Sequence, residues 1–130
     1  MEKETVYLTE CMKAVVGVPP TVKISGLDKS NLVLIEAVNK VELKTGIYLS
    51  TETRPTSVHY KKEWGCPSEI GGEDCICIEI LRNPKFNSDP VKWKDACLEL
   101  MRELKASLNQ STISVQFFNI EMHYLFTENE

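Results

Sequence analysis

The stretch Asp74-Cys-Ile-Cys-Ile-Glu-Ile-Leu81 decides the fold that the sequence predicts. Successive side chains of a β-strand point to opposite faces of its sheet. One face of this stretch carries Ile76, Ile78 and Ile80. The other face carries Cys75, Cys77 and Glu79. Three isoleucines in register indicate a central strand whose isoleucine face is covered by helices.

A helix and another strand are predicted to follow. Asp89 and Pro90 are typical of a helix start, with aspartate as the N-cap and proline at the first helical position. From Asp89 to Leu108 the apolar residues recur with a helical period. The predicted buried face of this helix consists of Trp93, Cys97, Leu100, Met101, Leu104 and Leu108. Residues 112–118 then alternate as a strand, with Ile113, Val115 and Phe117 facing inward, and after a kink at Asn119 a second extended segment covers 120–126.

The N-terminal half is predicted to begin with a helical extension over residues 1–19. Its apolar residues fall at helical spacing, and Gly17 and Pro19 are typical stop signals. The residues at that spacing are Leu8, Cys11, Met12, Val15 and Val16. A strand through 6–8 is the competing interpretation. Three further elements complete this half: a strand over 20–26, a helix that ends at Gly46, and a strand over 56–64. The inward residues of that helix are Leu34, Val38, Val41, Ile35 and Ala37.

The predicted fold class is α+β: two β-α-β units that form one sheet covered by two helices, preceded by the helical extension. The expected organisation is an extension at 1–19, a repeat domain at 20–126 and a polar tail at 127–130. Helices on one face leave the other face of the sheet open, so that face is solvated or covered by a partner.

Composition excludes several classes of protein. The chain has 130 residues and a net charge of −4, which argues against a nucleic-acid binder. It has no apolar run of the roughly 18 to 20 residues that would span a bilayer, and the start Met1-Glu-Lys-Glu4 is not that of a signal peptide. We therefore expect a cytoplasmic protein without membrane or nucleic-acid partners, whose five cysteines are reduced thiols.

Several candidate sites have weak support from spacing. His59, Cys66, Cys75 and Cys77 are metal-ligand types, but they lack a CxxC pair, so we expect no metal and no cofactor. No cysteine lies beside a base or glycine elbow that would mark it as a nucleophile. Gly71-Gly72 lacks the lysine and helix start of a phosphate loop and is a predicted turn.

Two charged residues at the central strand are stronger candidates. Glu79 lies on the face opposite the isoleucines, where it is either solvated or held by a basic group. Arg82 lies at the exit of the same strand and is a candidate ligand for a small carboxylate, although this position favours a surface salt bridge over anion binding. Separately, the apolar C-terminal segment predicts packing on this chain or on a second copy; its residues are Phe117, Phe118, Met122, Tyr124, Leu125 and Phe126.

The pattern resembles the tautomerase superfamily, that of macrophage migration inhibitory factor, and within it an uncharacterised bacterial branch. The resemblance covers about residues 20–126. It is carried by Pro20-Thr-Val-Lys-Ile-Ser-Gly26, Thr45-Gly46-Ile47, Cys77-Ile-Glu-Ile-Leu-Arg82, the helix from Asp89, and Val115-Gln-Phe-Phe118 with Tyr124. It implies a homotrimer with pockets at subunit interfaces, an N-terminal proline as general base, and a cationic side chain that holds the substrate's carboxylate.

This chain departs from the family pattern at the proline that aligns with the base. Pro20 is internal, so its nitrogen is an amide that cannot accept a proton. The resemblance therefore implies a homotrimer without proline-based catalysis, which acts in binding or as a structural protein, with Arg82 as the position that would hold a small carboxylate.

Two alternatives remain open. One is a tautomerase of keto–enol substrates in which Pro20 is the catalytic base after residues 1–19 are removed. The other is a ferredoxin-like regulatory or adaptor domain with the same β-α-β-β-α-β order. Strand pairing separates these folds, because the ferredoxin-like sheet is antiparallel whereas each tautomerase-like unit pairs parallel strands.

Overall fold

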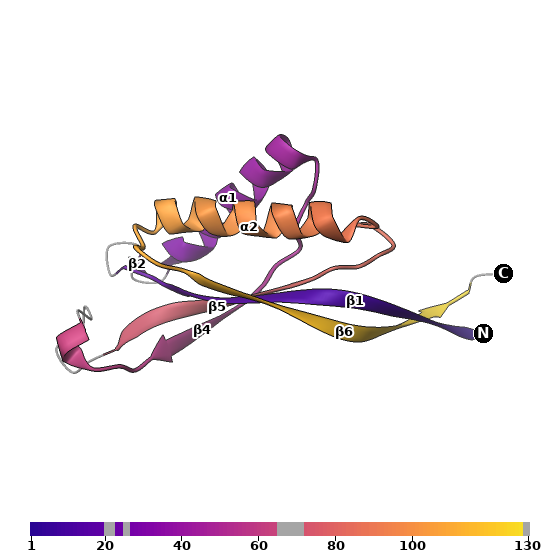
Figure 1. The fold of residues 1–130 in the computed structure, drawn as a ribbon, viewed down its shortest axis with the longest axis horizontal. Coiled ribbons are helices and arrows are strands. Elements are labelled where there is room, and N and C mark those ends of the chain that lie inside the picture. The colour runs from indigo at the N-terminus through magenta and orange to yellow at the C-terminus, as the bar shows by residue number, and fades with distance from the viewer. Residues whose placement is uncertain (20–22, 25–26, 65–71, 129–130) are drawn as a thin grey trace.

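The main body of the protein is one four-stranded sheet with two helices on one face (Figure 1). The computed structural model describes residues 1–19, 23–24, 27–64 and 72–128. The strands of the sheet are β1 (Glu2–Gly17), β4 (Glu52–Val58), β5 (Glu73–Leu81) and β6 (Ser114–Thr127). The helices are α1 (Lys29–Thr45), α2 (Pro90–Ser107) and the short 3-10 helix η2 (Lys62–Trp64). A separate small hairpin pairs β2 (Lys23–Ile24) with β3 (Leu27–Asp28).

The strands lie in the order β4-β5-β1-β6, and every pair of neighbours is antiparallel. The two strands of each β-α-β unit are therefore parallel but not adjacent. β5 lies between β1 and β4, and β1 lies between β5 and β6. The predicted α+β class with one sheet and two helices is confirmed. The parallel pairing expected of a tautomerase-like unit is wrong, and the antiparallel sheet is the pairing that the ferredoxin-like alternative required.

The helix predicted over residues 1–19 is also wrong, because this segment forms β1, an inner strand of the sheet. Its buried residues alternate: Met12, Ala14 and Val16 are each at most 2% exposed. They lie opposite Ile80, Ile78 and Ile76 of β5. The apolar residues of this segment fit both a helical and an alternating period, and hydrogen bonding to a neighbour on each side selects the strand.

The core fills the space between the sheet and the helices. All six residues of the predicted face of α2 are buried, as are the isoleucines of β5: Trp93, Cys97, Leu100, Met101, Leu104, Leu108, Ile76, Ile78 and Ile80. The Asp89 carboxylate accepts the N–H groups of Val91 (3.0 Å) and Lys92 (3.2 Å), which confirms the predicted N-cap. In α1, Leu34, Ala37, Val38 and Val41 are buried as predicted, whereas Ile35 is half exposed.

Two strand boundaries differ from the prediction. β4 covers Glu52–Val58 rather than 56–64, and it contains Pro55. Proline is tolerated there because β4 is an edge strand, where one side needs no hydrogen-bond donor. The kink predicted at Asn119 is absent from β6, since β1 pairs with this strand along its length, from Val15 opposite Ser114 to Glu2 opposite Thr127.

The β1–β6 pair continues past the helices as a two-stranded ribbon, and both chain termini lie at its far end (Figure 1). The backbone N–H of Glu128 donates to the carbonyl of Met1 at 3.2 Å. Within the described ranges, neither helix has the length and apolar character needed to cross a membrane.

Candidate functional site

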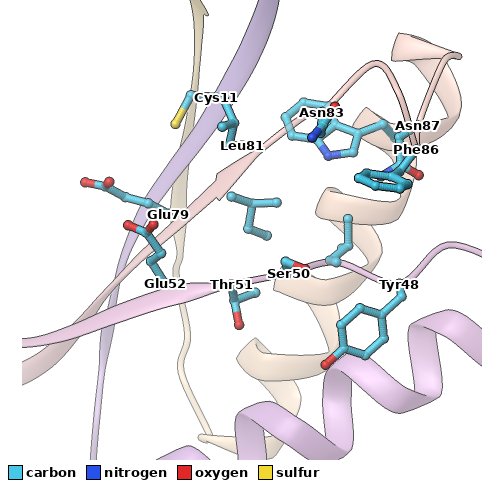
Figure 2. Close-up of a pocket in the computed structure, with 13 residues that line it drawn as sticks. Cys11, Tyr48, Ser50, Thr51, Glu52, Glu79, Leu81, Asn83, Phe86 and Asn87 are labelled. Carbon is cyan, nitrogen blue, oxygen red and sulfur yellow. The ribbon is translucent and has the colours of Figure 1, made fainter. Parts of the chain in front are cut away.

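A pocket of about 700 Å³ opens where β4, β5 and β1 meet the segments that follow α1 and β5 (Figure 2). This volume lies in the range of small-molecule sites. The lining residues from the sheet include Cys11, Glu52, Glu79 and Leu81. Those from the connecting segments and α2 include Tyr48, Ser50, Asn83, Phe86, Asn87 and Trp93.

The sheet end of the pocket is acidic. Glu52 and Glu79 lie directly opposite each other on β4 and β5, so two carboxylates share one cross-strand position. The Arg54 guanidinium donates to Glu79 at 2.6 Å, and this hydrogen bond raises the pKa of Arg54. Lys13 lies opposite Glu79 on the other side. Within the described part of the chain, Glu52 has no ion pair. A cationic ligand would therefore meet an uncompensated carboxylate here.

Cys11 lines the pocket beside these carboxylates. Partial burial raises the pKa of its thiol, and the negative charges of Glu79 and Glu52 raise that pKa further. A thiolate is thus disfavoured at this position, and Cys11 is not an activated nucleophile.

The opposite end of the pocket is aromatic. Figure 2 shows Tyr48 and Phe86 at one end, away from Cys11, Glu52 and Glu79. Trp93, from α2, also lines the pocket and is 1% exposed. Its indole N–H has no acceptor among the described residues. A buried donor without an acceptor is costly, so this wall retains unused hydrogen-bonding capacity.

Arg82, the predicted ligand residue, lies beside the pocket but is 6% exposed. Its Nε donates to Glu10 at 2.6 Å, and its Nη1 donates to the carbonyl of Asn87 at 2.9 Å. The Thr9 hydroxyl donates to the carbonyl of Arg82 at 2.7 Å. These contacts tie β1, the end of β5 and the segment that carries Phe86 together. The burial of the guanidinium, rather than a lack of donors, restricts access for a carboxylate ligand, since two of its five N–H groups have these partners.

The other predicted site residues are dispersed or outside the described structure. Pro20 and Cys66 lie outside the described residues. Cys75 and Cys77 are buried cysteines on β5. Within the described ranges, no three His, Cys, Asp or Glu side chains form a group that could hold a metal ion.

Sequence reasoning missed Tyr48, Glu52 and Phe86. Glu52 would have been found only with the register of β4, which places it opposite Glu79. An isolated aromatic residue in the Pro-, Asn- and Lys-containing segment 83–88 was the one available signal for Phe86.

Comparison with known proteins identifies the family. The sequence model of the SAM lyase family matches residues 21–126. The chain belongs to the SAM lyase family. This membership overturns the resemblance to the tautomerase superfamily, and with it the binding or structural role without catalysis, the processed tautomerase and the regulatory domain as functions. The match begins after β1, although β1 is an inner strand of the sheet.

Two solved structures of SAM lyases share this fold. A phage SAM lyase in its apo state aligns with a TM-score of 0.60 and 13% identity, over 95% of this chain and 92% of that one. A phage SAM lyase in complex with S-methyl-5′-thioadenosine aligns with a TM-score of 0.57 and 14% identity, over 92% of this chain and 90% of that one. No curated protein matches this sequence.

Proposed function

We propose that this protein cleaves S-adenosylmethionine without water and releases S-methyl-5′-thioadenosine. Membership of the SAM lyase family over residues 21–126 carries the proposal. The similarity in fold to a SAM lyase that holds S-methyl-5′-thioadenosine supports it. The pocket supports it as well, because its aromatic end and its acidic end match the two ends of the substrate. S-adenosylmethionine has an aromatic base at one end and a sulfonium and an ammonium at the other.

The reaction balances without a proton acceptor. The bond from sulfur to the γ-carbon of the methionyl group breaks, and its electron pair turns the sulfonium into a neutral thioether. The substrate's own carboxylate supplies an electron pair to the γ-carbon and closes a five-membered lactone. The products are S-methyl-5′-thioadenosine and homoserine lactone, and no water enters.

Within this reaction, the acidic end of the pocket binds the cationic substrate. Glu52 and Glu79 place negative charge where the sulfonium and ammonium would lie. The sulfonium loses its charge as the reaction proceeds, so its attraction to a carboxylate weakens in the transition state. Glu52 and Glu79 therefore contribute to substrate capture more than to the chemical step.

An elimination route requires a different role for the carboxylates. Removal of a β-proton would need a general base and would give 2-aminobut-3-enoate in place of the lactone. Glu52 and Glu79 are the carboxylates of the pocket that would serve as that base. The second product thus distinguishes substrate capture from proton abstraction.

Product analysis in H₂¹⁸O tests the function. Purified protein is incubated with S-adenosylmethionine, and the products are resolved by chromatography and mass spectrometry. The proposal predicts S-methyl-5′-thioadenosine and unlabelled homoserine lactone; homoserine formed later from the lactone carries ¹⁸O in its carboxyl group. Homoserine labelled in its hydroxyl group would show direct hydrolysis at the γ-carbon and contradict a lyase. Formation of neither product would contradict activity on this substrate.

We also propose that the protein assembles as a homotrimer. β6 is an edge strand of 14 residues whose far side pairs with no strand in the described part of the chain. Large apolar side chains are exposed along the sheet and the ribbon, namely Val15, Leu81, Phe118, Leu125 and Phe126. Long unpaired edges and exposed apolar patches are typical of surfaces that bind another chain.

A further inference from the structure

Tyr48 and Phe86 are exposed aromatic residues that do not serve the core. Tyr48 is 54% exposed and Phe86 is 75% exposed, yet both line the pocket. The aromatic contacts in the described structure join other residues, Trp93 with Phe117 and Tyr124 with Phe126. Exposed aromatic rings at a pocket mouth, without a packing role, are typical of ligand contacts.

The segment that carries Phe86 is held in place by hydrogen bonds. The N–H groups of Phe86 and Asn87 donate to the carbonyl of Asn83 at 3.0 and 2.9 Å. The Asn83 side chain accepts the N–H of Lys85 at 3.0 Å, and Arg82 donates to the carbonyl of Asn87. The ring of Phe86 is thus presented by a turn whose backbone is fixed on both sides, which lowers the entropy lost on binding.

Tyr48 reaches the same end of the pocket from a different element. It follows α1, which ends at Thr45 and is followed by Gly46 in a left-handed conformation (φ 78°). The Thr45 hydroxyl accepts the N–H of Ile47 at 3.1 Å and donates to the carbonyl of Val41 at 2.7 Å. Two elements far apart in sequence therefore bring their rings to one end of the cavity (Figure 2).

We propose that Tyr48 and Phe86 bind the adenine ring and so set the direction in which the substrate enters the pocket. This inference rests on the proposed function. A purine offers a flat π-face that stacks on aromatic side chains. With the adenine at Tyr48 and Phe86, the sulfonium points toward Glu52 and Glu79 at the other end. Arg82 is a positioning residue, because it holds the turn of Phe86 without contacting the ligand.

The two ends of the pocket are predicted to bind different parts of the substrate. S-methyl-5′-thioadenosine keeps the adenine but has no sulfonium and no methionyl group. S-methylmethionine keeps the sulfonium and the amino acid but has no adenine. The aromatic end should therefore dominate binding of the first compound, and the acidic end should dominate binding of the second.

Calorimetric titration of full-length variants tests this division. Phe86→Ala should weaken binding of S-methyl-5′-thioadenosine on the order of tenfold, from the strength of base–aromatic stacking, and leave S-methylmethionine binding unchanged. Phe86→Trp should retain binding of both compounds. Glu52→Gln should weaken S-methylmethionine binding and change S-methyl-5′-thioadenosine binding less than twofold. Leu43→Ala is the matched control, since Leu43 is 88% exposed on α1 and lies outside the pocket.

The outcomes separate this inference from the proposed function. Unchanged binding of S-methyl-5′-thioadenosine by folded Phe86→Ala, or no binding by the unmodified protein, overturns the aromatic site even if the lyase reaction is observed. Phe86-dependent binding without cleavage of S-adenosylmethionine supports the aromatic site while the proposed reaction fails. An equal loss of S-methylmethionine binding in Phe86→Ala overturns the division between the ends.

Discussion

Glu52 and Glu79 face each other across two antiparallel strands at one end of the pocket. Like charges at directly opposite positions destabilise a sheet. Arg54 compensates Glu79 at 2.6 Å, but Glu52 has no ion pair within the described residues. The repulsion between the two carboxylates destabilises the fold, whereas the same negative charge favours binding of a cation. Removal of the Glu52 charge should therefore raise the stability of the fold and lower the affinity for a cationic ligand.

Glu52→Gln is therefore expected to stabilise the fold and to impair the enzyme. Relief of the repulsion should raise the free energy of unfolding by roughly 0.2–1 kcal/mol. The KM for S-adenosylmethionine should rise roughly tenfold, the worth of one interaction with a charged group, with little change in kcat. Urea unfolding and steady-state kinetics measure the two effects. Glu36→Gln on the exposed face of α1 is the control, and a large fall in kcat for Glu52→Gln would instead indicate a general base.

Arg82 is expected to be a stability residue that also shapes the pocket. Its guanidinium is almost fully buried and pairs with Glu10 and Asn87. Arg82→Ala leaves these partners unsatisfied and should cost about 2–4 kcal/mol of unfolding free energy. A double-mutant cycle with Glu10→Gln measures the coupling between the two side chains. Additive losses in that cycle would show that the ion pair contributes nothing.

The sequence predicts those parts of the structure whose pattern lies within a single helix or strand. The isoleucine face of β5 and the capped, amphipathic α2 were predicted because each pattern lies within one element. β1 was misassigned, since its apolar residues fit two periods and only pairing with β5 and β6 decides between them. Because β1 was missing from the predicted sheet, no strand separated β5 from β6, and the two strands of that β-α-β unit were predicted to pair directly and in parallel.

The site was less predictable than the fold for the same physical reason. Glu79 and Arg82 were predictable as candidates because Glu79 lies on β5 and Arg82 directly follows it, and the alternating pattern of β5 is local to this strand. Glu52 becomes a candidate site residue only through the register of β4 against β5, which no local sequence pattern determines. Phe86 and Tyr48 come together only through the tertiary arrangement of two connecting segments.

The thiol of Cys97 should be inert in the folded protein. Burial raises its pKa from 9.0 to about 12, with a smaller contribution from Cys11. Because the folded pKa lies above the unfolded one, this group's contribution to stability is complete below pH 9 and is lost as pH rises toward 12. Iodoacetamide at pH 8 should leave Cys97 unlabelled in native buffer and label it in urea, as read by peptide mass spectrometry. Rapid native labelling would contradict its burial.

The end of the β1–β6 ribbon should be sensitive to pH through His123. Hydrogen bonds to Glu4 first, and then to Glu121, raise the pKa of this exposed imidazole. A raised folded pKa means that the stabilisation is complete below the unfolded value of 6.5 and is lost as pH rises through the folded value. Amide exchange near His123 should therefore be slower at pH 5.5 than at pH 8 after correction for intrinsic rates. His123→Gln should abolish that difference in exchange rate. An unchanged difference would show that groups other than His123 cause it.

Assembly should depend on the exposed apolar residues of β6. Light scattering on a sizing column should give three times the chain mass of 14.8 kDa if the homotrimer forms. Phe118 is 47% exposed and lies opposite Cys11 on the sheet. Phe118→Asp places a charge on this surface and should reduce the mass toward that of one chain, because burial of an unpaired carboxylate at an interface is costly. Leu43→Asp, on the exposed face of α1, should leave the mass unchanged. A single-chain mass for the unmodified protein would rule out the trimer.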